Sequence, residues 1–218
     1  MTMRLGVMGG MFDPVHNAHL KVADIAFGHL QLDRLYLVPC ATPNHRGQPG
    51  ASQADRLSML QLAIADRPGW IADDREFRRG GVSYMVDTLM SLRREFAGAQ
   101  LVYILGRDSF FSLPGWHRWK EIFELCHLCV VSRPAPEDNT GQSTGPDLMR
   151  EIAGRKVGSV SALFSKPVGN IYDINELALV HSSTRVREIL LTGSLPDTEL
   201  PQAVLSYIKQ HGLYTEPG

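Results

Sequence analysis

Short, mostly apolar runs alternate with helical patterns along the first 131 residues. Runs at 5–8, 35–38, 70–72, 101–105 and 125–131 predict strands, because each is short and is followed by turn or polar residues. The run at 101–105 is continuous, which is typical of a strand buried on both faces of a parallel sheet. Strands that alternate with helices predict an α/β fold, a doubly wound parallel sheet of the Rossmann-like kind.

Apolar residues spaced three or four apart mark the helices between these strands. The pattern over 20–30 predicts a helix directly after the first strand. Ser52 is a capping residue for a second helix, and Ser83 is expected to begin a third. A short helix is expected over 116–124, before the strand at 125–131.

The C-terminal part has a less regular pattern. Residues 134–146 are rich in Pro, Asp, Gly, Ser and Thr, which indicates a flexible surface loop. A last strand is expected at 170–174, a helix that begins at 182–184 and ends at Gly193, and a final helix over 201–212. We expect one domain over 1–218, with the part after about residue 134 partly a small C-terminal helical appendage.

The composition is that of an ordinary globular protein, with 44% hydrophobic and 21% charged residues among 218. The formal net charge of −1 provides no general basic field, so neither nucleic acid nor a membrane surface is expected as a partner. Arg4 and Asp13 interrupt the apolar start, which argues against a signal peptide or a membrane span. The oligomeric state, monomer or small homo-oligomer, is left open.

Three cysteines argue against a disulfide framework and favour a reducing cytoplasm. Cys126 and Cys129 have C-x-x-C spacing, but they lie in a strand-like run, where positions three apart face opposite sides. Buried structural thiols are therefore expected, rather than a zinc or redox site.

The chemistry is concentrated in residues 9–19, Gly-Gly-Met-Phe-Asp-Pro-Val-His-Asn-Ala-His, between the first strand and the first helix. Two glycines allow a tight turn and a close approach to a ligand. His16 and His19 lie three apart and share one face of a first helical turn. Free N–H groups and the positive end of the helix dipole suit an anion such as phosphate there.

This run resembles the GGTFDPVHxGH signature of the nucleotidylyltransferase superfamily, whose paired histidines bind the phosphates being exchanged. Within the superfamily the chain resembles the bacterial nicotinate-mononucleotide adenylyltransferases. Residues 43–46 resemble the loop over the nucleotide, 83–89 the SYTxDTL segment beside the nicotinate, and 113–116 the loop that places a tryptophan on the pyridine ring. The closing segment, 204–214, also resembles that family's last helix.

Two further segments are candidates for nucleotide contacts. If the strand order is 3-2-1-4-5, the turn after the fourth strand meets the first turn across one crevice. Asp108 in that turn either accepts hydrogen bonds from ribose hydroxyls or caps a helix. Residues 182–187 either cap a helix or bind an anion, since Arg187 in a first helical turn is unfavourable for the dipole without a phosphate.

The resemblance implies adenylyl transfer from ATP to nicotinate mononucleotide in NAD biosynthesis, with Mg²⁺ bound to ATP rather than held by a carboxylate cage. It implies catalytic roles for His16, His19 and Arg187. The residues expected to bind ATP are Gly9, Gly10, Phe12, Arg46, Gly106, Asp108, Ser182, Ser183 and Thr184. The residues expected to bind nicotinate mononucleotide are Asn44, His45, Tyr84, Met85 and Trp116.

Three positions depart from the family pattern. Met11 replaces a usual Thr or Ser, Ala18 a usual Gly, and Met85 a usual Thr. These departures put efficiency and substrate preference in doubt more than the reaction class. Two alternatives stay open. One is another transferase of the superfamily that acts on phosphopantetheine or uses CTP, and the other is a weakly catalytic nucleotide-binding paralogue. A half-buried core position is the structural alternative for Trp116.

Overall fold

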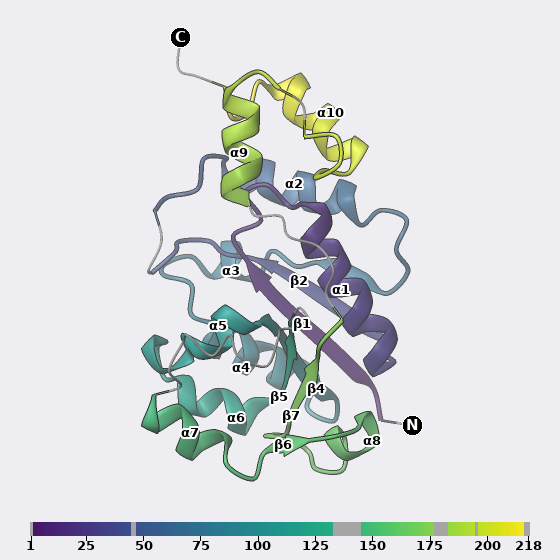
Figure 1. Cartoon of the computed structure of the whole chain (residues 1–218), viewed down its shortest axis with the longest axis vertical. Helices are drawn as coiled ribbons and strands as arrows, with labels where there is room; N and C mark the ends of the chain where they lie inside the picture. Colours follow the sequence, from purple (N-terminus) through teal and green to yellow (C-terminus); the bar gives the residue numbers. More distant parts are fainter. Residues whose placement is uncertain (1, 45–46, 133–144, 177–182, 195, 216–218) are drawn as a thin grey trace. The chain divides into compact units, whose positions relative to one another are not determined.

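The computed structural model describes residues 2–44, 47–132, 145–176, 183–194 and 196–215 (Figure 1). Seven parallel strands form one sheet in the order β3-β2-β1-β4-β5-β7-β6. This order meets the condition of a 3-2-1-4-5 arrangement considered above and extends it by β7 and β6. The strands are β1 (Arg4–Gly10), β2 (Arg34–Pro39), β3 (Trp70–Ala72), β4 (Gln100–Gly106), β5 (His127–Val131), β6 (Lys156–Val157) and β7 (Ile171–Ile174).

The chain divides into two compact units, of which the first contains the described residues within 1–8, 23–35 and 84–178. Here β4 pairs with β1 on one side and with β5 on the other, with Val7 opposite Tyr103 and Gly106 opposite Val131. Residues 101–105 of β4 are all buried, which confirms the prediction for this run. The helices of this unit are α4 (Met85–Glu95), α5 (Arg107–Phe111), α6 (Ile122–Leu125), α7 (Pro146–Ile152) and α8 (Val160–Leu163), with short 3₁₀ turns η1 (Leu113–Gly115) and η2 (Trp119–Glu121).

The second unit contains the described residues within 9–22, 36–83 and 179–218. Its helices are the first part of α1 (Asn17–Leu30), α2 (Gln53–Ala63), α3 (Arg75–Arg79), α9 (Ser183–Leu191) and α10 (Gln202–His211). Helix α10 packs on α2, where the Tyr207 hydroxyl donates to Asp55 over 3.0 Å (Figure 1). Ser52 caps α2 as predicted, because its hydroxyl accepts from the Asp55 N–H. None of the described helices is long and apolar enough to cross a membrane.

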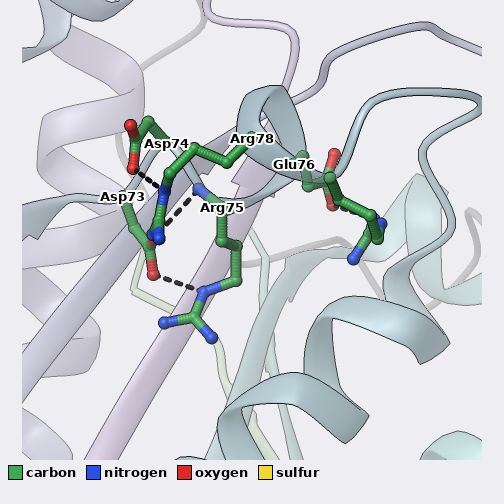
Figure 2. Close-up of polar contacts among 6 residues, drawn as sticks. Asp73, Asp74, Arg75, Glu76 and Arg78 are labelled. Atoms are coloured by element: carbon green, nitrogen blue, oxygen red, sulfur yellow. Dashed lines mark hydrogen bonds and ion pairs between the residues drawn. The ribbon is translucent and has the colours of Figure 1, made fainter.

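Helix α3 is a short element that the apolar pattern did not predict (Figure 2). The buried Asp73 carboxylate accepts from the backbone N–H of Arg75 over 2.9 Å and from its Nε over 2.5 Å. Arg78 donates from Nε to Asp74 over 2.8 Å. These polar contacts, rather than an apolar stripe, hold the segment between β3 and α4 in a helical turn.

Two local predictions were wrong. The helix expected to begin at Ser83 begins at Met85, because the Ser83 hydroxyl accepts from the Ala41 N–H over 2.8 Å instead of capping a helix. The helix expected over 116–124 begins only at Trp119, as η2 followed by α6, since Arg118 before it has a left-handed φ of 50°. The loop expected over 134–146 lies outside the described residues, apart from its last two positions.

The two cysteines with C-x-x-C spacing are fully buried, as predicted for structural thiols. Cys126 ends α6 and Cys129 lies within β5. Burial raises the pKa of the Cys126 thiol to about 12 and also raises that of Cys129. Both thiols therefore stay protonated at neutral pH, where a thiol is a poor metal ligand and nucleophile.

Candidate active site

The turn between β1 and α1 is built around the ring of Phe12. This ring is fully buried and lies edge-on to the ring of His19, with 5.1 Å between centroids. Phe12 itself has a positive φ of 47°, and a Cβ on Gly10 would lie only 3.1 Å from its ring. A side chain at position 10 would therefore press on the Phe12 ring. Since that ring is buried, Phe12 has only its backbone to offer a nucleotide.

His16 and His19 form a reciprocal cap at the start of α1. The His16 carbonyl accepts the first helical hydrogen bond, from the Leu20 N–H. Nδ1 of His16 accepts from the His19 N–H over 3.4 Å, and Nδ1 of His19 accepts from the His16 N–H over 3.3 Å. This is the pattern of a capping box, in which the N-cap and N3 side chains each accept the other's N–H.

The reciprocal cap fixes the tautomer of both imidazoles. Because Nδ1 accepts a hydrogen bond in each neutral ring, the proton of each ring is on Nε2. The two rings stack with 3.7 Å between centroids and 23° between planes, so they lie side by side at the start of α1. The prediction that the two histidines share one face is confirmed.

The helix start offers fewer backbone donors than the sequence suggested. The Asn17 N–H donates to the Glu199 carbonyl over 2.7 Å, and the His19 N–H is used in the cap. Of the first three helical N–H groups, only that of Ala18 has no acceptor among the described residues. An anion at this helix start would thus be bound by one backbone N–H and the imidazoles.

A buried carboxylate that sequence reasoning left without a role lies three residues before His16. Asp13 is 2% exposed, and its oxygens accept from the Gly50 N–H over 2.8 Å and the Ala51 N–H over 3.0 Å. They also accept from the Tyr214 hydroxyl over 2.7 Å. Among the described cations Arg187 is the nearest, with Nη1 3.6 Å from the Asp13 carboxylate.

Helix α9 approaches the same turn with two polar side chains. The Ser183 hydroxyl donates to the Pro14 carbonyl over 3.2 Å, and Arg187 Nη1 donates to the Asp13 backbone carbonyl over 2.6 Å. The Arg187 side chain remains 32% exposed. The structure thus places two of the predicted residues, Ser183 and Arg187, against the histidine-bearing turn, while Thr184 is exposed.

Arg56 is a further residue that the sequence did not single out. Its side chain is almost fully buried, and Nη1 donates to the carbonyls of Met11 and Cys40 over 2.8 and 2.7 Å. Burial lowers the pKa of Arg56. Arg56 therefore joins the backbone of the β1–α1 turn, at Met11, to Cys40, the residue that follows β2.

In the first unit, the residues expected near the nicotinate lie on α4 and η1. Tyr84 is the N-cap residue of α4, and its ring lies 4.3 Å from the ring of His117. The half-buried Trp116 donates from its indole N–H to the Ser112 hydroxyl over 3.1 Å, and its ring centroid lies 6.2 Å from that of Tyr103.

In the turn after β4, Gly106 is the N-cap residue of α5. Asp108 is exposed in the first turn of α5 and makes no side-chain cap bond, so its interpretation as a helix cap was wrong. Asn44 is also exposed, and Gly9 is half-buried at the end of β1. The predicted residues His45, Arg46 and Ser182 lie outside the described residues.

Within the described part of the chain, no group of three or more His, Cys, Asp or Glu residues could hold a metal ion. The acid nearest the histidines, Asp13, already accepts from two N–H groups and a hydroxyl. This carboxylate does not fit the role of a magnesium ligand.

Comparison with known proteins decides the family. Residues 7–189 match the family model described as cytidylyltransferase-like. A protein from Pseudomonas fluorescens, named a probable nicotinate-nucleotide adenylyltransferase, is 42% identical over 219 residues and is covered, like this chain, over its full length. The chain belongs to the nicotinate-nucleotide adenylyltransferase family.

A second relative with that name, from Methylococcus capsulatus, is 40% identical over 97% of this chain and 100% of its own. Among solved structures, the Plasmodium falciparum nicotinic acid mononucleotide adenylyltransferase complexed with NaAD has a TM-score of 0.73, with 97% of each chain covered. At 16% identity that likeness shows the fold. The resemblance drawn from the motifs is thereby confirmed.

The three departures from the nicotinate-nucleotide adenylyltransferase pattern fall at ordered positions. Met11 is held through its carbonyl by Arg56, and the Ala18 N–H is the one without an acceptor among the residues that the structure describes. Met85 is the first residue of α4. Since each of these backbone groups is fixed independently of its side chain, the substitutions leave the backbone donors and acceptors in place.

Proposed function

We propose that this chain transfers the adenylyl group of ATP to nicotinate mononucleotide, giving nicotinic acid adenine dinucleotide and pyrophosphate. The observation that carries the proposal is the stacked pair His16 and His19, each with its proton on Nε2, in the turn to which Arg187 donates a hydrogen bond, in a chain of this family. Such donors suit phosphate oxygens whose charge rises during transfer.

In the proposed step, an oxygen of the mononucleotide phosphate forms a bond to the α-phosphorus of ATP. The bond from that phosphorus to the bridging oxygen breaks, and its electron pair leaves with pyrophosphate. The attacking oxygen is already an anion, so no general base is needed. Catalysis then consists of positioning and charge stabilisation, as in phosphoryl transfer.

The roles follow from the donors at each position. His16 and His19 donate from Nε2 to the α-phosphate, and Arg187 binds the departing pyrophosphate with Arg46 assisting. The remaining ATP contacts are assigned to Gly9, Gly10, Phe12 (through its backbone), Gly106, Asp108, Ser182, Ser183 and Thr184. The mononucleotide contacts are assigned to Asn44, His45, Tyr84, Met85 and Trp116.

Magnesium would enter bound to ATP. Because the described residues form no carboxylate cage, phosphate oxygens and water would supply its ligands. When bound, it would neutralise part of the charge on the phosphates. None of the three cysteines forms a disulfide among the described residues, which favours the reducing cytoplasm as the place where the chain works.

The start of α4 supports a preference for the acid over the amide. Its N-cap, Tyr84, makes no side-chain cap bond, and among the described residues neither the Met85 nor the Val86 N–H has an acceptor. A carboxylate accepts at both oxygens, whereas an amide nitrogen only donates. Two open N–H groups at a helix start therefore favour nicotinate, and Met85 leaves them in place.

A pyrophosphate-release assay tests the proposal. Purified chain is given ATP or CTP and, in turn, nicotinate mononucleotide, nicotinamide mononucleotide and phosphopantetheine. Release with ATP and nicotinate mononucleotide at the highest catalytic efficiency is expected. Preference for CTP or phosphopantetheine would assign the chain to another transferase reaction, and no release with any pair would favour a binding role.

A further inference from the structure

The end of the chain reaches the turn that carries the histidines. Helix α10 ends at Gly212, which is left-handed with φ of 58°, and Tyr214 is left-handed with φ of 60°. These two positions bend the chain so that the Tyr214 ring lies on Gly50, where an added Cβ would approach it to 3.3 Å. The Tyr214 hydroxyl then donates to Asp13 Oδ1 over 2.7 Å.

We propose that Tyr214 is a positioning residue for adenylyl transfer, which acts through Asp13 to keep the Arg187 guanidinium available to the triphosphate of ATP. The inference rests on the proposed function, in which Arg187 binds the departing pyrophosphate. It adds a residue 201 positions away from Asp13 to the machinery of the reaction.

Whether the Arg187 guanidinium stays available depends on which groups bond to the Asp13 carboxylate. Oδ1 accepts from the Ala51 N–H and the Tyr214 hydroxyl, and Oδ2 accepts from the Gly50 N–H. Arg187 Nη1 is 3.6 Å from Oδ2, too far for a hydrogen bond, and donates to the Asp13 backbone carbonyl instead. Neutral donors thus form the hydrogen bonds to the Asp13 carboxylate, and the Arg187 guanidinium does not form a bidentate ion pair with it.

Removing the hydroxyl changes this balance. Oδ1 would regain an unused acceptor position, and the buried charge of Asp13 would have one donor fewer. The nearest cation, Arg187, would then be drawn into the close carboxylate pair that arginine forms readily. ATP would have to break that pair before its phosphates could be bound.

Tyr214 is suited to this role because it remains a donor. Burial and the charge of Asp13 raise the pKa of the Tyr214 hydroxyl above its usual value. The phenol therefore stays protonated across the neutral range, and its hydrogen bond to Asp13 does not vary with pH there.

The test compares Tyr214→Phe with Tyr207→Phe. Both remove one hydroxyl that donates to an aspartate, but Tyr207 donates to Asp55, between α10 and α2, and not to Asp13. In Tyr214→Phe we expect the KM for ATP and the Kd of a non-hydrolysable ATP analogue to rise about tenfold. The KM for nicotinate mononucleotide should not change. In Tyr207→Phe both ATP values should match the parent.

Two outcomes would overturn the role. One is unchanged analogue binding in Tyr214→Phe, and the other is an equal loss for ATP and the mononucleotide, which a merely structural residue would give. A double-mutant cycle adds a second check: in an Asp13→Asn background Tyr214→Phe should have no further effect on analogue binding, and a full tenfold effect there would refute action through Asp13.

The analogue measurement separates this inference from the proposed function. If the parent chain binds the analogue but transfers nothing to nicotinate mononucleotide, the proposed function fails, and the ratio of Kd values still decides the role of Tyr214. If the parent chain does not bind the analogue, both are refuted.

Discussion

His16 is assigned two duties that can be separated by substitution. Nδ1 accepts the His19 N–H and caps α1, while Nε2 is assigned to the α-phosphate. His16→Asn retains the cap, because asparagine is among the best N-cap residues. Its shorter amide does not reach the position of Nε2. His16→Ala loses both the cap and the donor.

The two variants should differ in stability but not in activity. Loss of a cap costs about 1 kcal/mol, and His16 is only 3% exposed, so His16→Ala should also lose packing. His16→Ala should therefore be less stable than His16→Asn by at least about 1 kcal/mol. Loss of a donor to a developing charge should lower kcat about 10²- to 10³-fold in both variants.

Urea denaturation gives the stabilities and pyrophosphate release under saturating substrates gives kcat. His29→Asn, at the exposed end of α1, is the matched control and should keep the parent kcat. Near-parent turnover in a folded His16→Asn variant would limit His16 to capping. Equal stability of the Asn and Ala variants would refute the cap.

Four further results are expected. Arg187→Ala should raise the KM for ATP more than that for the mononucleotide, and unchanged ATP kinetics would leave Arg187 with only a structural role. Trp116→Ala should weaken the binding of nicotinate mononucleotide and of nicotinamide mononucleotide equally, by about 0.5–1.5 kcal/mol of lost stacking in a binding titration. Met85→Thr should widen the preference for the acid over the amide mononucleotide. Burial lowers the pKa of His127 to about 4 from 6.5, so the unfolded chain takes up a proton first as pH falls. Denaturation at a series of pH values should show stability falling between pH 6.5 and 4 by up to about 3 kcal/mol, and His127→Asn should flatten that slope.

The sequence predicted those features of the fold that depend on neighbouring residues along the chain. The apolar runs located six of the seven strands in the described sheet, all but the two-residue β6, and Ser52 and Gly212 marked helix ends that the structure confirms. The spacing of His16 and His19 was enough to place them on one face, because three residues is close to one helical turn.

The sequence failed where a distant partner or a polar contact decides the structure. Ser83 does not begin a helix, because its hydroxyl is bonded to Ala41, 42 residues away. Helix α3 depends on the hydrogen bond between the buried Asp73 and Arg75. A helix held by such polar contacts has no periodic pattern of apolar residues by which the sequence could reveal it. The contact of Asp13 with Tyr214 joins opposite ends of the chain, and no pattern within one sequence pairs such residues.

A competition between acid and amide tests the central claim most directly. The chain is given nicotinate mononucleotide and nicotinamide mononucleotide at equal, saturating concentrations, together with Mg²⁺ and a limiting amount of ATP. The two dinucleotide products are then separated by chromatography. The open N–H groups at Met85 and Val86 predict that nicotinic acid adenine dinucleotide is the main product. A product that is mainly the amide dinucleotide, or no dinucleotide at all, would contradict the account.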